Sequence, residues 1–174
     1  SKEIQKSNMP PRNILFLCSF NAGRAMVAKG ILNAFASPDY RAFAAGDEPE
    51  PTPCPDALSV LARHLETVQG VRVKHWSVFT RPGAPKIDMV ISLCNNAVGE
   101  ICPVTLPGRP LTAHWNITDP STSADAAARR AAFEQVYQEL YARISDLIEI
   151  PLTKQGKKLE KTINAIGWLN ATAA

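Results

Sequence analysis

The residues best placed to do chemistry are a cysteine and an arginine with five residues between them, in Cys18-Ser19-Phe20-Asn21-Ala22-Gly23-Arg24. Five intervening residues can wrap around a tetrahedral oxyanion with their backbone N–H groups pointing inward. A following helix adds the positive end of its dipole, and Arg24 adds a planar fork for two oxygens. We therefore expect residues 19–24 to bind an oxyanion and to favour the nucleophilic thiolate of Cys18. The alternative is a buried cysteine followed by a surface arginine.

Three further cysteines, Cys54, Cys94 and Cys102, bring the total to four. The chain is too long to need a disulfide scaffold, and cysteines in a reducing compartment are more often catalytic, metal-binding or redox-active. Zinc is not expected, because the cysteine spacing fits no common ligand pair and the three histidines form no cluster. The sequence thus predicts thiol chemistry without a metal.

Short apolar runs alternate with segments of helical spacing along the chain. Strands are predicted at 13–17, 40–45, 89–93 and 111–115, and helices at 24–35, 55–66, 123–148 and 153–169. This alternation indicates an α/β fold with a parallel sheet flanked by helices on both faces. Such sheets bind ligands at the carboxyl ends of their strands. Cys18, Cys94 and Asp119 each follow a predicted strand, so we expect them at one edge of the sheet.

Length and charge narrow the class of protein further. The 174 residues suit one compact domain, and 19 basic against 16 acidic residues leave a net charge of +3, too small to indicate nucleic-acid binding. No apolar run approaches the length of a membrane span, and the polar start lacks a secretory signal, so a cytoplasmic location is expected. We divide the chain into a disordered leader or expression remnant, a main domain and a C-terminal helical extension, at 1–10, 11–150 and 151–174.

Several motifs in order resemble the low-molecular-weight protein tyrosine phosphatase superfamily, most closely its arsenate reductase branch. They are the segment 18–24, Ala44-Ala45-Gly46, Cys94-Asn95-Asn96-Ala97, Cys102-Pro103, Pro107-Gly108-Arg109-Pro110, His114-Trp115 and Asp119-Pro120. The resemblance covers about residues 13–148 and implies a three-layer fold with a four-stranded parallel sheet. It also implies that Cys18 is the nucleophile, Arg24 the oxyanion clamp and Asp119 the general acid. Asn21 would hold the shape of the loop.

Cys94 and Cys102 separate a reductase from a phosphatase within this resemblance. A phosphatase needs one cysteine, whereas reduction of arsenate takes two electrons and a second thiol, with a third thiol to collect the disulfide. The resemblance implies that Cys94 attacks Cys18 to release arsenite and that Cys102 then pairs with Cys94. No bound cofactor is expected, and an external thiol reductant (thioredoxin, glutaredoxin or a small thiol) would restore the enzyme. The alternative is two buried cysteines that flank a turn.

The loop departs from the family pattern at Phe20, Ala22 and Ala25, where the family has Gly, Ser and Ser or Thr. Ala25 cannot supply the hydroxyl that stabilises the thiolate in the family, and Ala44 replaces another supporting serine. Two alternatives follow: a phosphatase of aryl or tyrosine phosphates, and a degenerate member that binds an oxyanion or a partner without efficient turnover. The expected partners are an arsenate or phosphate-type oxyanion and a thioredoxin-like reductant, with neither nucleic acid nor a membrane.

These interpretations predict a definite geometry. The N–H groups of residues 19–24 should converge on a point about 3.5 Å from the Cys18 sulfur, with Asp119 facing it from the opposite loop. Cys94 and Cys102 should lie on a nearby segment, reduced rather than bonded if an intervening helical turn keeps them apart. An outward-facing loop with Arg24 turned to solvent would favour the binding-only interpretation. Cys54 has no expected role, and His114 and Trp115 should pack beside the site.

Overall fold

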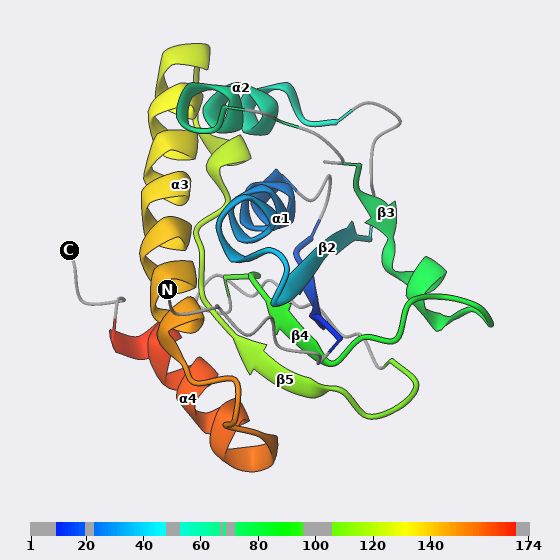
Figure 1. Ribbon diagram of the computed structural model, residues 1–174. Helices are drawn as coiled ribbons and strands as arrows, with labels where there is room; N and C mark the ends of the chain where they lie inside the picture. Colours follow the sequence, from blue (N-terminus) through cyan, green and yellow to red (C-terminus); the bar gives the residue numbers. More distant parts are fainter. Residues whose placement is uncertain are drawn as a thin grey trace.

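The computed structural model describes residues 10–19, 23–47, 53–66, 68, 72–95 and 106–169, so the predicted leader falls almost entirely outside the described residues. Alternating strands and helices make up the described chain (Figure 1). In chain order they are β1 (Arg12–Leu17), α1 (Gly23–Ala36), β2 (Tyr40–Gly46), α2 (Pro55–His64), β3 (Lys74–His75), the 3-10 helix η1 (Trp76–Thr80), β4 (Met89–Ser92), β5 (Leu111–His114), the 3-10 helix η3 (Pro120–Thr122), α3 (Ala126–Glu149) and α4 (Gly156–Leu169).

The strands form one parallel sheet in the order β3-β2-β1-β4-β5. The four predicted strands are confirmed, and the structure corrects their number to five. The added strand, β3, has two residues, too few for an apolar pattern to reveal it. β1 is central: Leu17 pairs with Ala45 on one side and with Ser92 on the other. The carboxyl ends of three strands therefore meet directly before Cys18.

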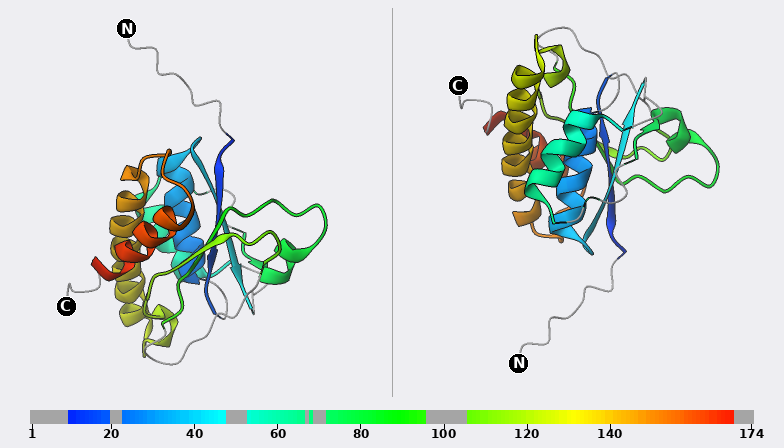
Figure 2. Two further views of the ribbon diagram at one scale, coloured as in Figure 1. Left: turned by 90° about the horizontal axis from the view of Figure 1, so that it is seen from below. Right: turned by 90° about the horizontal axis from the view of Figure 1, so that it is seen from above.

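The sheet separates two layers of side chains, because successive residues of a strand point to opposite faces. The four α-helices lie on one face and η1 on the other (Figure 2). On the helical face, Ile14 and Phe16 of β1 belong to one apolar cluster with Met26 of α1. On the opposite face, Leu15 and Leu17 cluster with Phe79 of η1. The three-layer α/β arrangement is confirmed.

The helix α4 covers the outer edge of the sheet beside β5. Asn164 accepts from the N–H of His114 over 2.9 Å and donates to the carbonyl of Thr112 over 3.3 Å, while Glu160 accepts from the N–H of Thr112 over 3.1 Å. The helix approaches closely at Gly167, where a Cβ would lie 2.7 Å from the Trp115 ring. Over the described part of the chain, no helix combines the length and apolarity needed to cross a membrane.

Candidate active site

Cys18 lies directly after β1, with only 3% of its surface exposed. Its backbone N–H donates to the carbonyl of Ala45 over 3.2 Å, which continues the pairing of β1 with β2 past the end of the strand. The N–H groups of Arg24 and Ala25, in the first turn of α1, donate to the thiol sulfur. The sulfur is therefore held between the carboxyl edge of the sheet and the N-terminus of α1.

The predicted oxyanion-binding loop is described only at its two ends. Phe20, Asn21 and Ala22 lie outside the described residues, so the convergence of their N–H groups stays a prediction. At the near end, the Ser19 hydroxyl accepts a hydrogen bond from Arg24 over 3.0 Å. At the far end, Gly23 begins α1 and is buried.

Arg24 is buried, with 2% of its surface exposed, and is not turned to solvent. Its Nη1 donates to the carbonyls of Ile117 at 2.8 Å and Leu93 at 3.3 Å, and its Nη2 donates to Ser19. Leu93 follows β4, and Ile117 belongs to the segment between β5 and η3. The guanidinium thus ties the predicted loop to two other segments at the same edge of the sheet. These bonds make it a structural anchor as well as the predicted oxyanion clamp.

Asp119, the predicted general acid, forms the N-cap of η3. Its Oδ1 accepts from the N–H of Ser121 over 2.9 Å and from the hydroxyl of Ser121 over 2.7 Å. The carboxylate also lies close enough to raise the pKa values of the Cys18 and Cys54 thiols. Asp119 is therefore a neighbour of Cys18, as the strand pattern predicts, while its role as an acid stays a prediction.

The electrostatics of Cys18 correct the sequence-based expectation of a favoured thiolate. Burial raises the pKa of the Cys18 thiol to about 11, against the opposing effects of Arg24 and of the N–H groups at the start of α1. The sequence indicates which charges and dipoles surround the sulfur. It does not indicate that the sulfur loses nearly all of its hydration, and this loss outweighs them.

Cys54 is a neighbour of this site that the sequence analysis did not assign. It is the N-cap residue of α2 and is buried, and this burial raises the pKa of its thiol. A Cβ placed on Gly23 would lie 3.3 Å from that sulfur, so Cys54 packs against the far end of the predicted loop. The proline-rich stretch before α2 gave no signal of this contact.

Cys94 follows β4 and is fully buried. It is disulfide-bonded, whereas Cys18 and Cys54 are free, so the expectation that Cys94 is reduced is wrong. That expectation depended on an intervening helical turn that keeps the sulfurs of Cys94 and Cys102 apart. The partner of Cys94 lies outside the described residues, as does Cys102. Arg24 donates to the carbonyl directly before Cys94, which brings this third cysteine to the same edge as Cys18.

A family model described as "Low molecular weight phosphotyrosine protein phosphatase" matches residues 13–162. This match spans most of the chain and includes the described residues of the Cys18 site. The chain belongs to the low-molecular-weight phosphotyrosine protein phosphatase family. In this phosphatase-family fold, the described residues hold no group of three or more His, Cys, Asp or Glu side chains arranged to bind a metal ion.

Relatives of this phosphatase-family chain include several named arsenate reductases. The arsenate reductase of Halalkalibacterium halodurans is 25% identical over 142 residues, covering 81% of this chain and 98% of the relative. A solved structure described as an arsenate reductase in the phosphate binding state has a TM-score of 0.60 and 21% identity, covering 79% of this chain and 96% of the other. A thioredoxin-dependent arsenate reductase of Corynebacterium glutamicum has a TM-score of 0.53 and 21% identity. The match covers 81% of this chain and 62% of that structure's chain. The fold is shared with both structures.

Proposed function

We propose that this member of the low-molecular-weight phosphatase family is an arsenate reductase that uses Cys18 as its nucleophile and an internal disulfide cascade. The observation that carries the proposal is the state of Cys94, which is buried and disulfide-bonded beside the Arg24–Leu93 contact. A phosphatase requires no second redox-active thiol at this position, whereas a reductase does. The arsenate reductases among its relatives support the same choice.

The proposed reaction begins when the Cys18 thiolate attacks arsenate and an arsenate oxygen leaves as water or hydroxide, with Asp119 donating the proton. The Cys94 thiolate then attacks the Cys18 sulfur, a Cys18–Cys94 disulfide forms, and arsenic departs as arsenite with two more electrons. Cys102 next attacks Cys94, which frees Cys18 and leaves a Cys94–Cys102 disulfide. Each cycle thus oxidises two thiols and reduces one arsenate.

An external dithiol must reduce the final disulfide, and we propose a thioredoxin-type protein in the cytoplasm for this step. The thioredoxin-dependent reductase among the structural neighbours supports this choice of reductant. Cysteine thiols are kept reduced in that compartment, and disulfides there are usually transient. We therefore interpret the disulfide at Cys94 as a catalytic intermediate.

The test measures NADPH oxidation with arsenate, thioredoxin and thioredoxin reductase. We expect Cys18→Ser, Cys94→Ser and Cys102→Ser each to lose turnover by at least about 10³-fold, because each removes an obligatory covalent step. Cys54→Ala is the matched control, because it removes a buried free thiol beside the site that the cascade does not use. Full turnover by Cys94→Ser or Cys102→Ser would refute the cascade. Cleavage of p-nitrophenyl phosphate that survives loss of Cys94 would identify a phosphatase instead.

One observation favours a second candidate, an oxyanion-binding protein without efficient turnover. With the pKa of Cys18 at about 11, about 10⁻⁴ of the thiol is ionised at pH 7. Arg24 also donates hydrogen bonds within the protein, to the carbonyls of Leu93 and Ile117 and to the hydroxyl of Ser19. This candidate predicts arsenate binding by calorimetry at pH 7 without arsenite release, whereas the reductase releases arsenite in a single turnover even without thioredoxin.

A further inference from the structure

A chain of three polar side chains lies on the opposite face of the sheet from α1. The Ser92 hydroxyl is hydrogen-bonded to Nδ1 of His114, and Nε2 of His114 is 2.7 Å from Oδ1 of Asn116. An amide oxygen only accepts hydrogen bonds, so Nε2 carries the proton and donates it to Asn116. The lone pair of Nδ1 is then directed at the Ser92 hydroxyl, which donates to it.

The backbone fixes this chain in place. Ser92 and His114 are paired neighbours at the carboxyl ends of β4 and β5. Ile91 and Ala113 belong to the apolar cluster beneath the α-helices, so the next residues, Ser92 and His114, face the other side. Both side chains are partly exposed, and Asn116 is exposed. The pair is thus held by strand pairing and partly exposed, unlike the buried Cys18.

In many enzymes a serine or cysteine nucleophile is activated by a histidine that accepts its proton. A third group orients that histidine, as Asn116 orients His114 here. The same chain provides a natural comparison at Ser77 and His75, whose Oγ and Nδ1 lie 2.7 Å apart. There, Nδ1 already accepts from the N–H of Ser77 over 3.1 Å, and no described residue bonds Nε2. His75 acts as a helix cap, whereas His114 has its lone pair directed at a hydroxyl.

We propose that Ser92, His114 and Asn116 form a second catalytic site, in which Ser92 accepts acyl groups from small carboxylic esters. Ser92 Oγ bonds to the ester carbon while its proton passes to His114 Nδ1, and that proton then goes to the departing alkoxide. Water hydrolyses the acyl-serine by the same route. Leu17, the strand partner of Ser92, and Val90 are buried apolar neighbours on the same face of the sheet. No thiol takes part, so the proposal does not depend on arsenate reduction.

The experiment treats the full chain with diisopropyl fluorophosphate, which forms a stable phosphoester on activated hydroxyls as fluoride leaves. Mass spectrometry of the peptides then locates the adduct. We expect one adduct at Ser92, none at Ser77, and an unchanged adduct in Cys18→Ser. His114→Gln should slow the labelling by about 10²-fold or more, because it removes the base. Labelling of Ser77 and Ser92 at equal rates, or no adduct at Ser92, would overturn the proposal.

Asn116 acts as a positioning residue, and its variants separate that role from a structural one. We expect Asn116→Ala to slow the labelling of Ser92 about tenfold and Asn116→Asp, which keeps an acceptor oxygen, to restore it. Because Asn116 is exposed, neither change empties part of the core. Imidazole added to a His114→Ala protein should also restore part of the labelling. If Asn116→Ala labels as fast as the original chain, the relay does not activate Ser92.

Discussion

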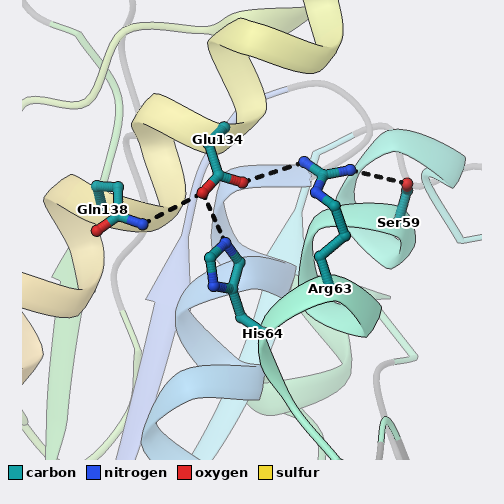
Figure 3. Close-up of polar contacts among 5 residues, drawn as sticks. All are labelled: Ser59, Arg63, His64, Glu134 and Gln138. Atoms are coloured by element: carbon teal, nitrogen blue, oxygen red, sulfur yellow. Dashed lines mark hydrogen bonds and ion pairs between the residues drawn. The ribbon is translucent and has the colours of Figure 1, made fainter.

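Two arginines of this protein each lie beside an acidic group, and the two acids respond in opposite directions. At the carboxyl edge of the sheet, Arg24 lies beside Cys18, and the pKa of that thiol is raised to about 11 by burial, which outweighs the arginine. On the outer surface, Glu134 of α3 accepts from Arg63 at 3.2 Å and from His64 at 2.6 Å (Figure 3). Although burial opposes it there, hydrogen bonds from Gln138, His64 and Arg63 lower the pKa of Glu134.

The opposite pKa shifts of Cys18 and Glu134 follow from their different exposure to water, because each of them has an arginine nearby. The Glu134 side chain keeps 37% of its surface exposed, and its three hydrogen bonds together outweigh the effect of burial on its pKa. Cys18 has lost nearly all contact with water, so the neutral thiol is favoured despite a nearby guanidinium. An arginine next to a thiol is therefore insufficient evidence for an activated nucleophile.

The largest expected effect is the loss of folding stability when the buried arginine is replaced, compared with the exposed one. Arg24→Met should lower the free energy of unfolding by about 3–6 kcal/mol, because the carbonyls of Ile117 and Leu93 lose a charged donor. Arg63→Met, the matched surface change, should cost about 1 kcal/mol or less. Urea denaturation of both variants checks this. Equal losses would mean that burial does not distinguish the two sites.

The second effect is an alkaline loss of stability that belongs to Cys18. The unfolded thiol releases its proton near pH 9, whereas the folded one holds it to about pH 11. Between these pH values the folded state binds the extra proton, so stability falls as pH rises, by about 1.4 kcal/mol per unit. Cys18→Ala should remove this part of the slope. The comparison uses denaturation midpoints at pH 8, 9, 10 and 11, and parallel curves would contradict it.

A smaller effect is expected on the acidity of Cys18 itself. The Asp119 carboxylate contributes to the raised pKa of Cys18, so Asp119→Asn should lower that pKa and speed alkylation at pH 8 by about tenfold or less. Asparagine also caps helices, which preserves the start of η3. Iodoacetamide labelling in a Cys54→Ala background, read at Cys18 by mass spectrometry, measures the change. Slower labelling would place Asp119 in a different role.

The smallest effect concerns the surface cluster. Glu134→Gln should lower the free energy of unfolding by about 0.2–1 kcal/mol at pH 7 and low salt, and by less at 0.5 M salt. Because the pKa of Glu134 is lowered, its contribution is present above the usual pKa and disappears as pH falls through the folded value. Thermal melts at pH 7 and pH 3 test both statements, and a larger difference at pH 3 would contradict them.

The sequence predicted the main strands and helices because each of them has its own apolar pattern. The run before Cys18 indicated a buried strand, and the Leu-rich face of 55–66 indicated α2. β3 escaped prediction because Lys74 and His75 owe their strand geometry to pairing with Ala45 and Gly46, a tertiary contact.

The sequence predicted which residues meet at the candidate site better than it predicted the pKa of Cys18. Strand ends brought Cys18 and Asp119 to one edge, as a parallel sheet requires. The contact of Cys54 with Gly23 joins residues far apart in the chain through the packing of α2 on α1, which no local motif records. The pKa of Cys18 depends on the water that such packing removes, and residue types alone do not give that quantity.

The hydrogen bonds from α4 to β5 also affect how this protein behaves at high concentration. β5 is the last strand of the sheet, and an open strand edge is a template on which another chain can add a strand and begin aggregation. Here the N–H groups of Thr112 and His114 and the carbonyl of Thr112 are already bonded by Glu160 and Asn164. An incoming strand would have to break these bonds and displace α4 before it could pair, so the helix protects this edge of the sheet from pairing with another chain.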